Sequence, residues 1–108
     1  MMQDARHHWA MKRVRESDQF APDFLRWLRL NWHIYLAFER RAYRAIKHGY
    51  RHLGSMAIIN NIRWQSMLAE RESEFKISNN VAPDLSRLFH LLHPQYAGFF
   101  RTHERSVA

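Results

Sequence analysis

The chain has 108 residues, of which 46% are hydrophobic and 14% aromatic, so it suits one folded domain and not a disordered polymer. It has no cysteine, which excludes disulfides, thiolate zinc sites and cysteine nucleophiles. Lys plus Arg total 17 against 10 Asp plus Glu, which gives a formal charge of +7 and a pI of about 10.6. This balance is typical of proteins that bind nucleic acid, an acidic protein or an anionic surface.

The first 18 residues do not predict export, and no apolar stretch predicts membrane insertion. Residues 1–18 are charged throughout and lack the apolar core of a secretory signal. No stretch approaches 18 uncharged apolar residues, so we expect no membrane-spanning helix and no membrane partner. The expected location is the cytoplasm.

In chain order, residues 1–20 form a basic N-terminal arm or extension, which is either a short amphipathic helix or a loose arm. We expect a single helical domain over residues 21–105, followed by a tail of residues 106–108. Pro22 and Asp23 mark the start of a helix that runs to about Leu30. Asn31 is a good N-cap for a second helix, which should run to about residue 48 and end at Gly49.

The second half of the domain predicts two more helices and two short strands. Ser55 is expected to cap a helix over residues 56–70, and a further helix starts at Ala82 or Pro83 and ends before Pro94. Residues 75–78 and 98–103 are expected to be short strands that pair. The predicted fold is therefore mainly α, a compact domain of three to four helices closed by a small two-stranded β-hairpin, as in winged-helix proteins. A purely helical bundle is the competing interpretation.

A stripe of basic residues is the most informative feature. Arg40, Arg44, Lys47 and Arg51 follow at spacings of four, three and four, which places them on one face of a helix. Like charges on one face repel, so the arrangement destabilises the helix unless an anion binds there. We expect the stripe to contact phosphates; the alternative is a solvated face that Glu39 partly neutralises.

Four further basic residues are expected to be secondary phosphate contacts: Arg63, Lys76, Arg87 and Arg101. Arg87 lies opposite the apolar face of the last predicted helix and is the more exposed candidate. Asn79 and Asn80 either read base edges or form the turn before that helix, and the turn role needs no ligand.

Catalytic chemistry is not expected. Glu74 and Lys76 have the Glu-x-Lys spacing of metal-dependent nucleases, but Asp23 and Asp84, the acidic residues that would complete the site, lie at helix starts where capping explains them. No nucleophile with an adjacent base and no glycine-rich phosphate loop is present. We therefore predict that the protein is not an enzyme and holds no cofactor.

Histidines and aromatic residues favour structural roles. His48 with His52, and His90 with His93, have spacings seen in metal pairs, but Gly49 and Pro94 end the helices that would hold them. We therefore predict no metal site. Six aromatic residues are interpreted as core rather than as base-stacking surfaces: Trp27, Trp32, Trp64, Phe89, Phe99 and Phe100.

About three quarters of the chain resembles a group of small, uncharacterised proteins encoded by bacteriophages and prophages. The residues that carry the resemblance are Ile62-Arg63-Trp64, Glu74 to Asn80, Ala82-Pro83, Arg87-Leu88-Phe89, His93-Pro94 and Gly98 to Arg101. The resemblance implies an accessory protein that acts inside a bacterial cell during infection or lysogeny. It brings no activity or catalytic residue.

Two hypotheses follow. The first is a non-enzymatic protein that binds nucleic acid, more specifically DNA, through the basic stripe. The second is a phage-encoded inhibitor or adaptor that binds an acidic host protein, such as a defence complex, through the same face. The oligomeric state is left open, with a homodimer among the alternatives.

Overall fold

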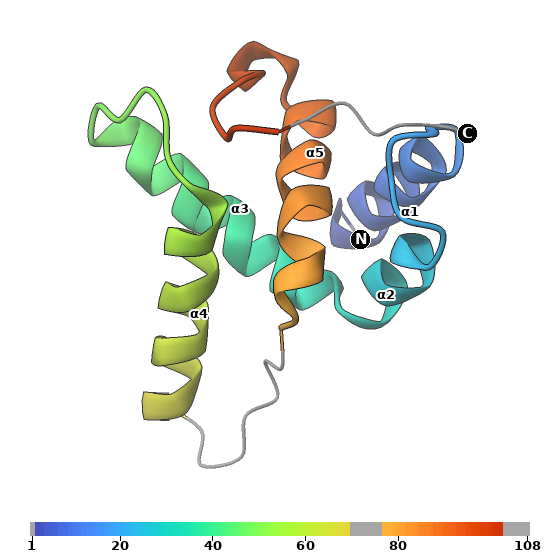
Figure 1. Ribbon diagram of the computed structural model, residues 1–108. Coiled ribbons are helices and arrows are strands. Elements are labelled where there is room, and N and C mark those ends of the chain that lie inside the picture. Colours follow the sequence, from blue (N-terminus) through green and yellow to red (C-terminus); the bar gives the residue numbers. More distant parts are fainter. Residues whose placement is uncertain (1, 70–76, 103–108) are drawn as a thin grey trace.

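A computed structural model describes residues 2–69 and 77–102 of the chain (Figure 1). The described residues form five α-helices and two short 3-10 helices: α1 Met2–Arg15, α2 Phe24–Leu30, α3 Trp32–Lys47, α4 Ser55–Ala69, η1 Asn79–Val81, α5 Ala82–Leu92 and η2 Pro94–Tyr96. The prediction of a mainly α domain is confirmed. The predicted starts and ends of α2, α3 and α5 agree with the structure to within about two residues.

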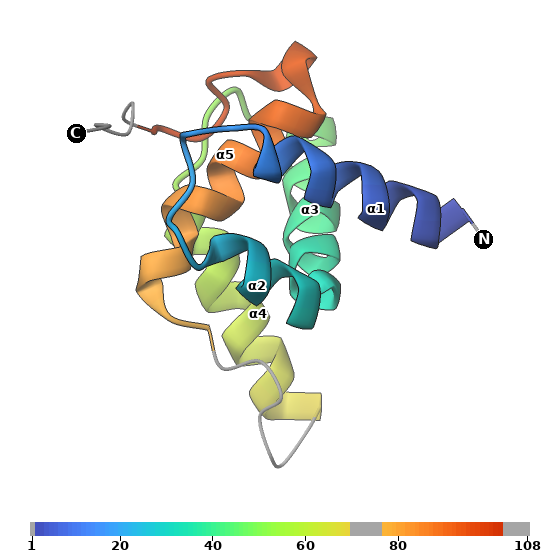
Figure 2. The ribbon, with the colours of Figure 1, turned by 90° about the vertical axis from the view of Figure 1, so that its right-hand side faces the viewer.

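Helix α5 is the centre of the domain. It contacts α1, α3 and α4, and Figure 1 shows it standing between α4 on one side and the pair α1 and α2 on the other. In Figure 2, α1 and α2 lie together on the near side of the molecule. The amphipathic face of α5 explains its position, because its buried residues occur at helical spacing around Leu85, Leu88, Phe89 and Leu92.

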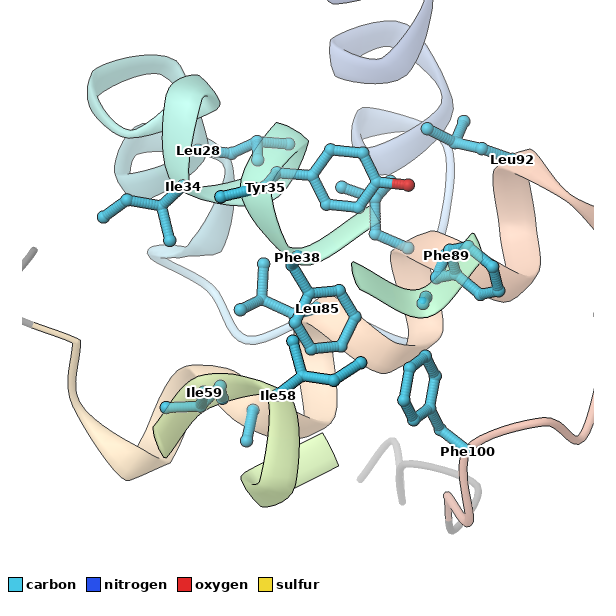
Figure 3. Packing of buried hydrophobic residues seen from close by; sticks show 14 of the residues in the cluster. Leu28, Ile34, Tyr35, Phe38, Ile58, Ile59, Leu85, Phe89, Leu92 and Phe100 are labelled. Carbon is cyan, nitrogen blue, oxygen red and sulfur yellow. The ribbon is translucent and has the colours of Figure 1, made fainter. Parts of the chain in front are cut away.

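The core is built from aromatic rings of α3, α5 and the segment after η2. Phe38 and Phe100 are 5.0 Å apart between ring centroids, and Phe89 and Phe100 are 5.6 Å apart. All three rings are at most 1% exposed. Figure 3 shows Phe38 directed toward Leu85 and Ile58. The prediction that Phe89 and Phe100 belong to the core is confirmed.

The boundary between α2 and α3 falls at Asn31, as expected, but for a different reason. The Asn31 side chain caps no N–H group of α3; its amide nitrogen instead donates a 2.9 Å hydrogen bond to the carbonyl oxygen of Trp27. Asn31 therefore satisfies a free carbonyl at the end of α2. The predicted boundary and the N-cap position of Asn31 are confirmed, but its side chain does not make the capping bond.

The N-terminal arm is a helix, which is one of the two alternatives left open by the sequence. Ala10, Met11 and Val14 of α1 are each at most 4% exposed and belong to the core. Their spacing of one and three residues places them on one face of the helix. Helix α1 packs against α2 and α5. The described part of residues 1–20 thus contributes to the same core as the rest of the chain.

The predicted β-hairpin is not seen in the described residues. Residues 77–78 and 98–102 form no strand, while residues 75, 76 and 103 lie outside the described part. Phe99 and Phe100 are 5% and 1% exposed, so two consecutive side chains enter the core, whereas a strand would point them to opposite faces. The carbonyl oxygen of Ile77 accepts a hydrogen bond from Arg63 instead of from a neighbouring strand.

Gly49 ends α3 in the left-handed conformation, with φ of +93°, and its N–H donates to the carbonyl of Ile46 over 3.0 Å. A Cβ at this position would meet no atom within 4 Å. A side chain would therefore destabilise the protein only through the strain of the left-handed backbone conformation. We expect Gly49→Ala to lower the free energy of unfolding by about 1–2 kcal/mol in urea titration.

Gly54→Ala is the matched control for this substitution. A Cβ at Gly54 would also meet open space, but the φ of Gly54 lies outside the left-handed range. We expect it to leave the unfolding free energy unchanged or to raise it by up to about 1 kcal/mol, since alanine restricts the unfolded chain. Equal effects of the two substitutions would contradict the assigned role of Gly49.

Candidate nucleic-acid interface

The basic stripe is present on α3, but it is shorter than predicted. Arg40, Arg44 and Lys47 are exposed and share one face of the helix. Arg51 is exposed too, yet it lies beyond Gly49, where the helix has ended. The prediction that all four residues belong to one helix is therefore wrong for Arg51, because the positive φ of Gly49 turns the chain away from the helix axis.

No acidic side chain neutralises the stripe within the described residues. The ion pairs found there join Arg6 to Glu39, His93 to Glu39, and Arg87 to Asp84. Glu39, which the sequence offered as a neutralising group, is only 6% exposed and points into the core. The three cations of α3 therefore face solvent without a carboxylate of the described chain beside them.

Glu39 is the centre of a buried polar network. Its Oε2 atom accepts hydrogen bonds from Arg6 over 2.6 Å, from the Tyr35 hydroxyl over 3.0 Å and from His93 Nε2 over 2.7 Å. The Tyr43 hydroxyl lies 2.8 Å from Nδ1 of the same histidine. Since a carboxylate oxygen only accepts, His93 Nε2–H donates to Glu39, and the other ring nitrogen of His93 is left to bond with the Tyr43 hydroxyl.

The pKa values of this network follow from its burial and its hydrogen bonds. Burial by itself would raise the pKa of Glu39, but hydrogen bonds from Arg6, His93 and Tyr35 outweigh it and hold that pKa below its ordinary value. Burial and the negative charge of Glu39 raise the pKa of Tyr35 well above its ordinary value. The network thus joins α1, α3 and the residue after α5 through one carboxylate, and we interpret it as structural.

Arg41 lies beside the stripe and is held in place by hydrogen bonds. Its Nε donates to the side-chain oxygen of Asn61 on α4 over 2.7 Å, and one terminal nitrogen donates to the carbonyl of Ala37 over 3.1 Å. Partial burial lowers the pKa of Arg41, and the positive charges of Arg40 and Arg44 lower it further. The cations on this part of α3 therefore repel one another.

The segment after η2 brings a further cation to the end of α3. The backbone N–H of Leu53 donates to the carbonyl of Phe99 over 3.1 Å, and His52 Nδ1 donates to the carbonyl of Gly98 over 3.2 Å. Arg101 is exposed next to this contact and, with His52, lines a hollow of about 600 Å³. Arg51 and Arg101, 50 positions apart in the chain, thus lie on adjoining segments.

The other secondary candidates are engaged elsewhere or undescribed. Arg63 donates to the side chains of Asn60 and Asn79, over 3.0 and 2.8 Å, and to the carbonyl of Ile77, which ties α4 to the segment before α5. The Arg87 side chain, expected to be exposed, is only 16% exposed and pairs with Asp84 over 2.9 Å. Lys76 lies outside the described residues.

The two asparagines before α5 form a turn, in line with the structural interpretation. Asn79 and Asn80 begin the 3-10 helix η1, whose start is capped by the Ser78 hydroxyl accepting from the Asn80 N–H over 3.1 Å. Asp84 is 3% exposed and accepts from the Ala21 N–H over 3.1 Å, so it joins the chain before α2 to α5. Asp23 precedes α2 without a side-chain capping bond.

The paired histidines have backbone or side-chain partners that are unrelated to a metal. His48 Nδ1 donates to the carbonyl of Arg44 over 2.8 Å, and His90 Nε2 accepts from the Phe100 N–H over 3.1 Å. Burial lowers the pKa of His90, consistent with a ring that must stay neutral to accept this bond. Among the described residues, no three His, Asp or Glu side chains gather where they could hold a metal ion. The Glu-x-Lys pair, Glu74 and Lys76, lies outside the described residues.

Tyr50 and Trp64 are two of the exposed aromatic side chains that were not predicted. Tyr50 is 57% exposed and directly follows Gly49, and Trp64 on α4 is 56% exposed, so the assignment of Trp64 to the core is wrong. The signal for Tyr50 was present in the sequence, because an aromatic residue after a helix-ending glycine lies in a loop. Trp64 lies at a helical position between buried residues, and only the packing of α4 decides that it faces outward.

The described residues define the protein as a small helical domain with an uncompensated basic surface at the C-terminal end of α3. Comparisons with models of known protein families, with curated proteins and with solved structures found no match to this chain. None of the described helices has the length and apolar character needed to cross a membrane. A functional proposal therefore rests on the basic surface of α3 and not on similarity to a known protein.

Proposed function

We propose that the protein is a small, non-enzymatic accessory protein of phage type that binds nucleic acid through the basic surface of α3. Arg40, Arg44 and Lys47 would contact successive phosphates, with Arg51 and Arg101 as neighbouring contacts. Arg63 and Arg87 are left out of the proposed contact set, since their guanidinium groups already bond to other parts of the chain.

The observation that carries this proposal is the absence of any carboxylate partner for Arg40, Arg44 and Lys47 within the described residues. Like charges kept side by side weaken a helix, and a phosphate backbone relieves their repulsion by replacing small counterions. Most of the 17 basic residues are arginines, whose guanidinium groups bind phosphate in bidentate fashion.

A salt titration with a charge-reversed variant tests the proposal. For wild type and generic duplex DNA, log K should fall steeply with log salt concentration in fluorescence anisotropy. We expect Arg44→Glu with Lys47→Glu to weaken binding by about tenfold or more at about 100 mM salt and to reduce the slope by about 2, since two phosphate contacts are lost.

Arg26→Glu with Arg29→Glu provides the matched control. Both arginines are exposed on α2, and the double substitution changes the net charge by the same amount as the test variant. We expect it to leave the slope within about 0.5 of wild type. If both variants reduced the slope equally, binding would depend on overall charge and not on the α3 surface.

A second candidate function is an inhibitor or adaptor that binds an acidic host protein through the same surface. Three large apolar side chains of α4 favour it, because Trp64, Met67 and Leu68 are each more than half exposed, as in many protein-binding surfaces. DNA binding that is unchanged by the Arg44 and Lys47 reversal, or that is absent even below about 100 mM salt, would favour this function over the first.

A further inference from the structure

Two hollows at the end of α3 share a single residue, Tyr50. The first, of about 310 Å³, lies between α3 and α4, and the second, of about 230 Å³, lies between the end of α3 and the segment after η2. Tyr50 lines both and is 57% exposed. Its N–H donates to the carbonyl of Ala45 over 3.1 Å, so the turn at Gly49 fixes the backbone of Tyr50 at this position.

The first hollow is lined by both apolar and basic side chains. Ala45, Leu53 and Ile58 supply apolar surface, and Arg41 and Arg44 supply positive charge. Arg41 is fixed by its bonds to Asn61 and to the carbonyl of Ala37. A simple anion would not contact the apolar side chains, and an uncharged apolar ligand would not contact the arginines. A flat ring joined to a phosphate contacts both kinds of side chain.

The second hollow has the same combination of surfaces. Ile46, Tyr96 and Phe99 give it apolar and aromatic walls, and Arg51 supplies a cation. Its volume is again suited to one planar ring system, since both hollows lie near or below the lower end of the range for small-molecule sites, about 300–1000 Å³.

The basic stripe adjoins these two hollows. Arg44 lines the first hollow, Ile46 lines the second, and Lys47 lies on the exposed side of α3 between the directions of these two residues. A strand whose bases enter the two hollows can therefore place phosphates against Arg44 and Lys47. This arrangement repeats the pattern of single-strand binding proteins, which combine a cationic track with aromatic side chains for stacking.

We infer that the surface binds single-stranded nucleic acid, with the Tyr50 ring stacked between two successive unpaired bases that occupy the two hollows. The inference rests on the proposed function and adds the form of nucleic acid that is bound. The bases of a duplex are paired and stacked within the helix, so a duplex reaches only the phosphate contacts of the stripe. A single strand makes the same phosphate contacts and also fills both hollows.

The test compares two single-stranded probes that carry the same phosphates. One is a labelled 20-residue oligothymidylate, and the other is an abasic deoxyribose-phosphate strand of equal length. We expect wild type to bind the oligothymidylate about tenfold or more tightly than the abasic strand, since stacking of one base on an aromatic ring contributes about that factor or more. Tyr50→Ala should weaken oligothymidylate binding about tenfold and leave abasic binding unchanged.

Two further variants separate stacking from other effects. Tyr50→Phe keeps the ring and should bind the oligothymidylate like wild type. Trp9→Ala removes an exposed aromatic ring of α1 that lines neither hollow, and it should also bind like wild type. Circular dichroism should show that all three variants keep the helical content of wild type, because both substituted side chains are exposed.

The outcomes distinguish this inference from the proposed function. If wild type binds both strands equally, or if Tyr50→Ala binds the oligothymidylate as tightly as wild type, the stacking inference is overturned. The proposed function would survive that result provided that the reversal of Arg44 and Lys47 still weakened binding to duplex DNA. If wild type binds neither single strand nor duplex at about 50 mM salt, the proposed function fails and this inference fails with it.

Discussion

Phe89→Ala is expected to lower the free energy of unfolding by about 3–5 kcal/mol. Phe89 is fully buried on α5, and its ring centroid lies 5.6 Å from that of Phe100 and 4.9 Å from that of His93. Truncation removes apolar contact on several sides at once and leaves a cavity that helices packed on three sides cannot fill. Because domains of this size have a total stability of about 5–15 kcal/mol, the loss is a large share of it.

Urea titration followed by circular dichroism measures this effect, and Leu30→Ala provides the control. Leu30 ends α2 and is 72% exposed, so its truncation should change the unfolding free energy by less than about 0.5 kcal/mol. An effect of Phe89→Ala below about 1 kcal/mol would show that α5 is not the central helix of the core.

Glu39→Ala is expected to cost about 3–5 kcal/mol of stability at pH 7, because it leaves the buried donors of Tyr35 and His93, and also Arg6, without their shared acceptor. Glu39→Gln keeps the shape of the side chain and loses the charge, so it should cost less, about 2 kcal/mol. Arg6→Ala should cost less than Glu39→Ala, because the Glu39 carboxylate keeps its hydrogen bonds from Tyr35 and His93 and solvent reaches the Arg6 side chain, which is 41% exposed.

The cost of Glu39→Gln should depend on pH. The pKa of Glu39 is lower in the folded protein than its ordinary value of 4.5, so the folded state favours the carboxylate. The resulting stabilisation is complete above that ordinary value and is lost as the pH falls through the lower pKa of the folded state.

Urea titrations of wild type and Glu39→Gln at pH 7 and at about pH 3 measure this dependence. The difference between the two unfolding free energies should shrink at the lower pH. A difference that stays constant between the two pH values would mean that the Glu39 charge contributes nothing to stability.

Local signals in the sequence were sufficient for the helices. Pro83, Gly49 and the spacing of apolar residues act within one or two turns, and the structure confirms the helix boundaries that they predict. The predicted hairpin is not seen in the described residues. The alternation that predicted its first strand covered only residues 75–78, two of which lie outside the described part. In the second predicted strand the core takes both Phe99 and Phe100, and this packing outweighs a strand conformation.

The polar network around Glu39 had a partial signal. Glu39 follows Tyr35 by four residues, so both lie on the buried face of α3, and a single carboxylate on a buried face requires partners. Its other partners, Arg6 and His93, are 33 and 54 positions away in the chain. No spacing rule connects residues at such distances.

For the candidate binding residues too, part of the result could be predicted from the sequence and part depended on packing. Arg40, Arg44 and Lys47 were recognised as one basic face from their spacing alone, because a helix determines which residues share a side. The sequence by itself therefore determined helices α2 to α5, the core positions of Phe89 and Phe100, and the shared face of Arg40, Arg44 and Lys47. The tertiary structure alone decided that Glu39 turns inward, that Arg63 and Arg87 bond within the chain, and that Tyr50 stands between two hollows. These results depend on which distant segments pack together, and packing depends on the shape and burial of the whole chain, which no local pattern contains.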